Sequence, residues 1–259
     1  MSSALRFEWV RLRTLRSTYW LIGIGLLLTT AIAFGVAFAT RNDLITAEDA
    51  GIIVTGGAEL APFLAIFLAI IGIFATGHEY RHGTIQPTLT AIPQRTRLLL
   101  AKVLMVAITA AVITVVSVAI NIGLGSLYWQ NAPDLGAEPL SEVIPGYVVF
   151  VVLYAILGVA LGQLFRGVPS ALVILLVVPL IVETLIAALS LWSALDWLQP
   201  ALKFLPFSAG ARLIATGPYD ANGGPEFDFL GRWESGGVFA AFVAIILAVG
   251  WYLFKKRDA

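Results

Sequence analysis

Residues 147–165 read YVVFVVLYAILGVALGQLF and contain no charged side chain. A transmembrane helix needs about 20 consecutive apolar residues to cross a hydrocarbon core of roughly 30 Å. Five further stretches are also predominantly apolar, at about residues 19–40, 60–77, 98–129, 170–192 and 236–254. The sequence therefore predicts an all-α membrane protein whose six transmembrane helices form one domain over residues 1–259. The third stretch is longer than a bilayer core requires, so it should tilt or protrude.

The composition as a whole points to lipid as the main solvent. Hydrophobic residues make up 59% of the chain and charged residues 12%, against roughly 45–50% and about 25% in soluble domains. The formal net charge is zero, which gives no electrostatic support for a nucleic-acid partner. There is no cysteine, so disulfides, thiol catalysis and cysteine-ligated metals are excluded.

The basic residues predict how the spans are oriented, because cytoplasmic loops carry an excess of lysine and arginine. If the N-terminus is cytoplasmic, six crossings return the C-terminus to the same side. The cytoplasmic side then holds Arg6, Arg11, Arg13, Arg16, Arg81, Arg95, Arg97, Lys102, Arg166, Lys255, Lys256 and Arg257. The other side keeps only Arg41, Lys203, Arg212 and Arg232. We therefore expect a multi-pass protein of the plasma membrane with both termini cytoplasmic.

The segments outside the spans predict short helices and loops. The first sixteen residues have one apolar helical face, with the arginines largely on the other. That apolar face holds Leu5, Trp9, Leu12 and Leu15. Such a pattern is typical of an N-terminal helix lying in the membrane interface. A polar loop is predicted between spans one and two. Residues 193–235 hold apolar runs that are too short to cross and are interrupted by prolines, which predicts short outer helices before span six.

Residues 78–82 read HEYRH and match the zinc-protease pattern H-E-x-x-H. Two histidines four apart share a helix face and can hold one zinc ion, with the glutamate as general base. His78 and His82 are the only histidines, so a third ligand would have to be a carboxylate. The one acid within a span, Glu183, falls roughly 20 Å into the fifth span, toward the opposite side of the membrane. An intramembrane metalloprotease using His78, Glu79 and His82 is therefore kept only as an alternative.

The residues that follow resemble a known family. Residues 79–102 read EYRHGTIQPTLTAIPQRTRLLLAK. This stretch resembles the cytoplasmic loop between spans two and three in permease subunits of the ABC-2 type exporter family. The family pattern is roughly E-(Y/R)-x-x-G-T-(L/I)…L…P-x-(S/R)-R…K. The matching positions are Glu79, Gly83, Thr84, Leu89, Pro93, Arg95 and Lys102. Residues 254–258, FKKRD, resemble the family's short F-x-x-R-D tail, and the six-span layout agrees.

The resemblance implies that a coupling helix follows span two and docks on a separate P-loop ATPase. Here that helix would run over residues 85–91, after a turn at Gly83 and a cap from Thr84, and Pro93 would end it. The resemblance assigns ATPase coupling to Glu79, Tyr80, Arg81, Gly83, Thr84, Leu89, Pro93 and Arg95. Among these, Glu79, Arg81 and Arg95 are candidates for ion pairs with the ATPase.

The same resemblance implies a transport subunit and not an enzyme. The chain has no G-x-x-x-x-G-K-(S/T) loop to cradle phosphates, so Mg-ATP is expected on the partner ATPase. No catalytic or metal site is expected on this chain. A second permease copy, identical or different, would complete the substrate pathway within membrane lipid. Two alternatives stay open. An ATP-independent secondary transporter would more usually show inverted repeats and several intramembrane charges. A non-transporting membrane subunit would bind a partner and move nothing.

Three of the polar residues within the predicted spans are candidate functional or interhelical contacts, namely Glu183, Asn121 and Gln163. Placing the charged side chain of Glu183 within the membrane costs at least a few kcal/mol of free energy unless the carboxylate is paired or neutral. It is either a polar point in a translocation path or subunit interface, or a protonated or water-exposed group near the outer end. Pro179 should kink the same span. Asn121 and Gln163 are expected to form hydrogen bonds between helices. Residues 158–162, GVALG, fit the G-x-x-x-G pattern of close helix packing.

Overall fold

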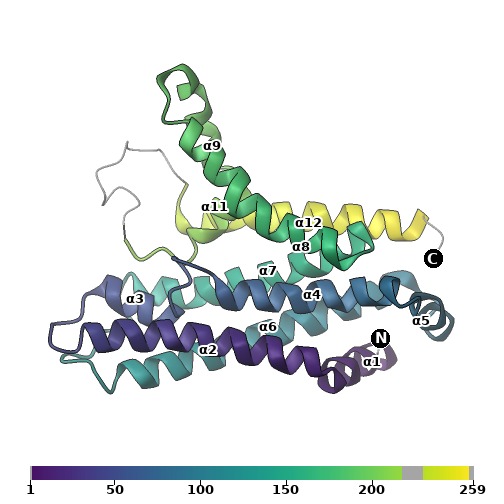
Figure 1. Cartoon of the computed structure of the whole chain (residues 1–259), viewed down its shortest axis with the longest axis horizontal. Helices are drawn as coiled ribbons and strands as arrows, with labels where there is room; N and C mark the ends of the chain where they lie inside the picture. Colours follow the sequence, from purple (N-terminus) through teal and green to yellow (C-terminus); the bar gives the residue numbers. More distant parts are fainter. Residues whose placement is uncertain (1, 218–229, 257–259) are drawn as a thin grey trace.

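The computed structural model describes residues 2–217 and 230–256, and every regular element in those residues is helical (Figure 1). Six helical stretches are long and apolar enough to cross a membrane. They are α2 (Arg16–Ala39), α4 (Phe63–Arg81), α6 (Arg95–Gly125), α7 (Leu140–Phe165), the fifth span Val168–Leu189 and α12 (Arg232–Lys256). The shorter elements are α1 (Ser2–Thr14), α3 (Ala47–Thr55), α5 (Ile85–Ala91), a 3-10 helix (Ser193–Leu198), α10 (Gln199–Leu202) and α11 (Pro206–Ala211). The chain is an all-helical multi-pass membrane protein, as predicted.

The observed spans agree with the predicted ones in number and order and differ at their ends. α4 continues to Arg81, beyond the predicted end at residue 77, so residues 78–81 form its last turn. α7 begins at Leu140, before the predicted start at residue 147. α6 covers 31 residues, which still exceeds the length that a bilayer core needs.

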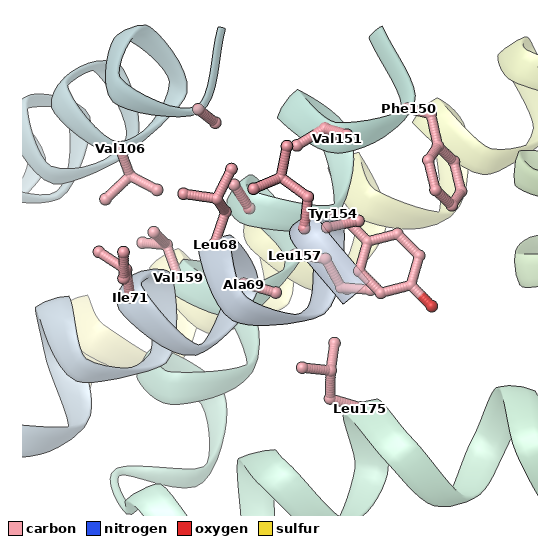
Figure 2. Packing of buried hydrophobic residues seen from close by; sticks show 14 of the residues in the cluster. Leu68, Ala69, Ile71, Val106, Phe150, Val151, Tyr154, Leu157, Val159 and Leu175 are labelled. Carbon is pink, nitrogen blue, oxygen red and sulfur yellow. The ribbon is translucent and has the colours of Figure 1, made fainter. Parts of the chain in front are cut away.

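The core of the bundle lies around α7, which packs against α4, α6 and α12. The buried side chains of α7 include Phe150, Tyr154 and Leu157, which belong to the same buried cluster as Leu68 of α4 (Figure 2). Val106 of α6 belongs to the same cluster. Because lipid tails are as apolar as these side chains, tight packing and not the hydrophobic effect has to hold such helices together.

α4 and α7 approach closely because small residues face each other. A Cβ atom on Gly158 would overlap the carbonyl oxygen of Ala69, and one on Gly72 would overlap the carbonyl oxygen of Ala155. Gly162 lies equally close to the next turn of α4. The close packing predicted from the G-x-x-x-G pattern is confirmed.

α3 lies where the hydropathy pattern predicts only a polar loop. The hydroxyl of Thr46 accepts the Asp49 amide hydrogen (3.1 Å), and the Asp49 carboxylate accepts from the Thr46 amide (3.4 Å). This capping box starts the helix. Its apolar residues, among them Ile53 and Val54, are buried against α2 and α6. The T-x-x-D pattern at residues 46–49 is the signal that predicts such a start.

The fifth span is irregular. It consists of α8 (Val168–Val177), a π-helical segment (Val178–Glu183) and α9 (Thr184–Leu189). Pro179 has no amide hydrogen and lies at the start of the π-helical segment, which accounts for the irregularity predicted there. α8 packs on α4 and α7, whereas α9 projects away from the bundle (Figure 1).

The short helices predicted before span six are present over residues 193–211. Pro200 and Pro206 lie in the first turns of α10 and α11, where a missing amide hydrogen costs no intrahelical bond. Pro218, the third proline of this segment, lies outside the described residues.

Candidate functional site at the α5 end of the bundle

One end of the bundle brings together α1, α5 and the C-terminal end of α12 (Figure 1). α4 ends there in a tight reversal at Gly83, whose φ is +66°. The amide of Thr84 donates to the carbonyl of Glu79 (2.9 Å), and the amide of Gly83 donates to the carbonyl of Tyr80 (3.4 Å). This is the Schellman arrangement, which favours glycine at the left-handed position. The predicted turn at Gly83 is confirmed.

α5 covers the residues predicted for the short helix, Ile85–Ala91. Its inner face buries Ile85 and Thr88. Ile85 packs with Leu98 of α6 and Phe254 of α12. The outer face is exposed and holds Gln86, Pro87, Thr90 and Ala91. α5 is therefore a short helix that packs through Ile85 on the ends of two spans and leaves its opposite face exposed.

Thr84 does not cap α5, which corrects the sequence-based expectation. Its backbone is helical (φ −82°, ψ −2°) and its side chain makes no cap hydrogen bond. An N-cap side chain typically reaches the following amides from a non-helical, extended backbone. The Schellman turn instead brings Thr84 into the helical region, and its carbonyl accepts a hydrogen bond from the Thr88 hydroxyl (2.8 Å).

The C-terminal end of α12 lies against the start of α6. Arg95 Nη1 donates to the carbonyl of Phe254 (2.6 Å), and the Arg95 guanidinium lies 5.6 Å from the centre of the Phe254 ring. The Trp251 indole donates to the Thr96 hydroxyl (3.1 Å). The two sequence stretches that carry the family resemblance therefore meet in space. Residues 257–258 of the F-x-x-R-D tail lie outside the described residues.

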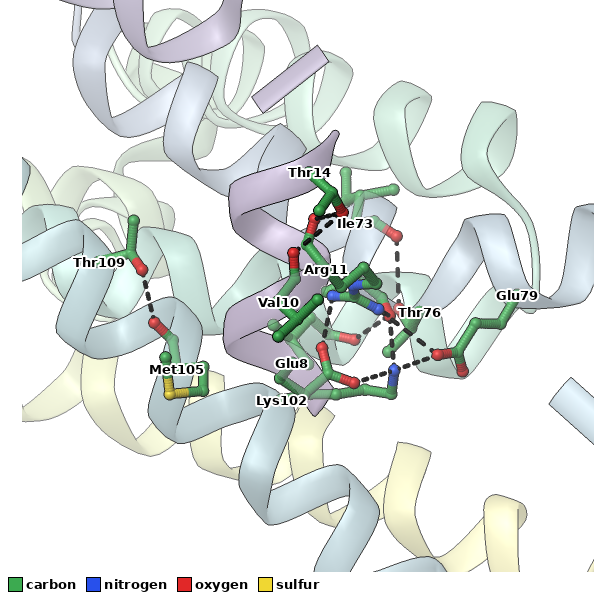
Figure 3. Close-up of polar contacts among 12 residues, drawn as sticks. Glu8, Val10, Arg11, Thr14, Ile73, Thr76, Glu79, Lys102, Met105 and Thr109 are labelled. Atoms are coloured by element: carbon green, nitrogen blue, oxygen red, sulfur yellow. Dashed lines mark hydrogen bonds and ion pairs between the residues drawn. The ribbon is translucent and has the colours of Figure 1, made fainter. Parts of the chain in front are cut away.

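Four charged side chains meet where α1, α4 and α6 come together (Figure 3). Lys102 Nζ lies 2.5 Å from Glu79 Oε1 and 2.8 Å from Glu8 Oε1, and it donates to the carbonyl of Ala75 (2.9 Å). Arg11 Nη2 lies 2.7 Å from Glu8 Oε2. Arg11 Nη1 lies 3.5 Å from Glu79 Oε1 and also donates to the Ala75 carbonyl. We call Glu8, Arg11, Glu79 and Lys102 the charge cluster.

The charge cluster is buried and formally neutral. The side chains of Lys102, Glu8 and Glu79 are 2%, 1% and 7% exposed. Charges that are removed from water are tolerated only when they are paired and hydrogen-bonded. The two glutamates and two bases pair with one another within the chain, although Glu79 Oε2 and Arg11 Nε have no hydrogen-bond partner among the described residues. The cluster therefore fixes α1, α4 and α6 to one another at the end of the bundle that carries α5.

Glu79 and Tyr80, both assigned to ATPase coupling, are engaged inside the chain. Glu79 pairs with Lys102 and Arg11, not with a group at the surface. The hydroxyl of Tyr80 accepts a hydrogen bond from Gln163 Nε2 (2.8 Å), which joins α4 to α7. Of the other positions assigned to coupling, four are exposed (Arg81, Gly83, Thr84, Pro93) and two are partly buried (Leu89, Arg95).

Glu8 is a candidate functional residue that the sequence pattern does not predict. The apolar face predicted for residues 1–16 includes Trp9, whereas the buried face of α1 holds Ala4, Glu8 and Leu12, and Trp9 is exposed. A signal was available, because Glu8 is the only acid in the first 42 residues. An acid isolated among arginines on a helix is a candidate for an ion pair.

His78 and His82 lie in contact at the end of α4, with ring centres 5.9 Å apart, and His78 stacks on Phe74. Glu79, the glutamate of the H-E-x-x-H pattern, is engaged by Lys102. Among residues 2–217 and 230–256, no group of three or more histidine, aspartate or glutamate side chains is placed to hold a metal ion. In the described structure the pattern therefore has neither a third ligand nor a free general base.

The polar residues of the spans form hydrogen bonds between helices. Asn121 Nδ2 of α6 donates to the carbonyl of Val54 in α3 (3.3 Å), and Gln163 joins α7 to α4 through Tyr80. Both residues thus have the interhelical role predicted for them.

Glu183 is buried at the end of the π-helical segment, with 4% of the residue exposed. Its Oε1 accepts from the Phe207 amide (2.9 Å), and its Oε2 accepts from the amide and the hydroxyl of Ser208 (2.7 Å each). Three donors satisfy a charged carboxylate well. Glu183 is therefore an anchor for α11, and the water-exposed alternative does not describe it.

A search among curated proteins found no match to this chain. Residues 20–259 match the family model described as a protein of unknown function, DUF2705. The match begins within α2 and includes the five later spans, α5 and the charge-cluster residues of α4 and α6. α1 precedes it. Because the match covers most of its length, the chain belongs to the DUF2705 family.

Proposed function

We propose that this chain is the permease subunit of an ABC-2 type exporter, with α5 as the coupling helix that docks on a separate P-loop ATPase. Mg-ATP binds to that ATPase, and a second permease copy completes the pathway. The protein lies in the plasma membrane with both termini cytoplasmic. The observation that carries this proposal is the geometry of α5, whose inner face is fixed to the spans and whose outer face is exposed.

A coupling helix has to pass a movement of the ATPase on to the spans, so it must be attached rigidly to them. α5 is continuous with α4 through the Schellman turn at Gly83. On its other side it leads into α6, and Ile85 packs on both α6 and α12. The ion pair between Glu79 and Lys102 joins the end of α4 to the first turns of α6, next to α5. A push on the outer face of α5 would therefore move α4 and α6 together, as rigid-body switching between two bundle states requires.

The distribution of basic residues supports the proposed orientation. The positive-inside rule places the end richer in lysine and arginine in the cytoplasm. α1, the end of α4 and the start of α6 carry six of the twelve arginines, and Lys255 and Lys256 end α12. These segments lie at the α5 end of the bundle (Figure 1). Arg41 and Arg212 belong to connections at the opposite end, beside α3 and α11.

The proposal predicts that a charge on the outer face of α5 separates the chain from its ATPase. We expect a P-loop ATPase to co-purify with the tagged chain in mild detergent and the Ala91→Glu variant to retain at least about tenfold less of it, which corresponds to roughly 1.4 kcal/mol. A buried carboxylate without a partner costs at least that much in an interface. Quantitative mass spectrometry of the purified complex measures the change.

Ala47→Glu is the matched control, because Ala47 is an exposed alanine on a short helix at the opposite end of the bundle. Acidic residues contribute little to orientation in the membrane, so neither variant should invert the protein. Equal loss of the ATPase from both variants would count against α5 as the docking element. Purification of the wild-type chain with no ATPase would favour the secondary transporter or the non-transporting subunit.

A further inference from the structure

The N-terminal helix has a second face that the charge cluster does not use. α1 turns Ala4, Glu8 and Leu12 toward the bundle. Leu15 is extended (φ −79°, ψ 118°), so α1 leaves the line of α2 and lies at the end of the bundle (Figure 1). The opposite face of α1 follows an i, i+4, i+7 row of exposed residues, Arg6, Val10 and Arg13.

The exposed face is positively charged because the charge cluster removes its only acid. Glu8 is the one acidic residue among residues 1–42, and it is buried in contact with Lys102 and Arg11. Arg6, Arg13 and Arg16 are exposed. None of these three arginines forms an ion pair with a described residue. Three positive charges are therefore left without a counter-charge from the described chain.

Exposed aromatic side chains lie among these arginines. Phe7 and Trp9 of α1 are 42% and 52% exposed, and Tyr19 and Trp20 of α2 are 58% and 72% exposed. The Tyr19 hydroxyl donates to the carbonyl of Arg13 (2.8 Å), which joins the start of α2 to α1. Tryptophan and tyrosine favour the boundary between headgroups and acyl chains. We call Arg6, Arg13 and Arg16 with these four aromatic residues the basic-aromatic surface.

We propose that the basic-aromatic surface binds the phosphate headgroups of anionic membrane lipids. Arginine presents a planar fork of donors that suits phosphate oxygens, and aromatic rings suit the boundary between headgroups and acyl chains. An acidic protein would satisfy the arginines but would also have to cover four exposed aromatic rings at the entry to a span. A surface of anionic lipid provides phosphates for the arginines and also covers the aromatic rings. This inference is independent of the proposed transport function.

The test compares lipid retention by wild-type and variant chains. The protein is placed in nanodiscs made of equal parts phosphatidylcholine and phosphatidylglycerol, released in the mass spectrometer, and its retained lipids are counted by class. Each arginine near an anionic surface changes binding about fivefold. We therefore expect Arg6→Gln/Arg13→Gln to lower retained phosphatidylglycerol by about tenfold or more relative to phosphatidylcholine.

Arg97→Gln/Lys256→Gln is the matched control, because it removes two exposed positive charges at the same end of the bundle but outside the basic-aromatic surface. It should retain phosphatidylglycerol as the wild type does. Thermal unfolding in pure phosphatidylcholine nanodiscs should be the same for all three proteins, since no substituted side chain is buried. Unchanged retention by the Arg6/Arg13 variant would overturn the proposal, and so would an equal loss in the control. The Arg6/Arg13 variant could instead lose a co-purifying protein while it retains phosphatidylglycerol normally. That result would assign the basic-aromatic surface to the protein and would also overturn the lipid-binding proposal.

Discussion

Lys102→Met is expected to lower the free energy of unfolding by about 3–5 kcal/mol, because it removes one partner from a buried ionic group. Glu8 and Glu79 would then share Arg11 alone, which leaves one uncompensated negative charge among α1, α4 and α6. The methionine side chain has a similar length, so the loss reflects charge and hydrogen bonds more than volume. Thermal or denaturant unfolding in a fixed detergent measures it.

A second substitution makes this prediction specific. Lys102→Met/Glu79→Gln restores neutrality, with Glu8 still paired to Arg11. It should recover more than half of the stability that Lys102→Met loses, because coupled residues are not additive. Arg97→Met, which removes an exposed charge from the same helix, should change stability by less than about 1 kcal/mol. A double variant as unstable as the single one would show that the charges are not coupled as the distances indicate.

Gly158→Ala is expected to cost about 1–3 kcal/mol, because a methyl group there meets the backbone of α4 and not a movable side chain. The nearest atom to the new Cβ would be the carbonyl oxygen of Ala69, followed by the carbonyl carbon of the same residue. α4 and α7 would have to separate, which loosens the closest helix pair of the core. Unfolding in detergent measures the loss of stability.

Gly35→Ala is the control for Gly158→Ala. Gly35 lies in α2 with no atom within 4 Å of the added Cβ. The substitution there should leave stability unchanged or raise it by up to about 1 kcal/mol, because alanine restricts the unfolded chain. Equal effects at both glycines would mean that α4 and α7 do not pack as the structure has them.

Hydropathy predicts the six spans because a run of about twenty apolar residues is stable as a helix across the bilayer, and the preference for glycine at helix ends predicts the tight turn at Gly83. The short helix after that turn is expected from the family resemblance. The partners of charged side chains do not follow from local rules. Glu79 and Lys102 lie in different helices, and only the packing of α4 on α6 shows that they bind each other. Hydropathy also treats α3 as a loop, because its capping box adds polar residues to a helix that is otherwise buried.

The ion pair between Glu79 and Lys102 suggests why the family pattern begins with a glutamate and ends with a lysine. The first and last polar positions of the pattern at residues 79–102 are Glu79 and Lys102, and they form the shortest ion pair of the charge cluster. The pattern therefore combines two roles. Its ends hold the α4–α6 hairpin together, and its middle, α5, exposes Gln86, Pro87, Thr90 and Ala91. Under the exporter proposal, the candidates for direct contact with the ATPase are thus the outer face of α5 and the exposed Arg81.

The most direct test of the exporter proposal is a crosslink from α5 to its partner. The chain has no cysteine, so Ala91→Cys and Ala47→Cys each provide a single thiol to carry a photoactivated crosslinker. The account predicts that membranes from the native host yield a crosslink between position 91 and a P-loop ATPase, and none from position 47. Crosslinks to an ATPase from position 47 and not from position 91, or none from either position, would contradict it.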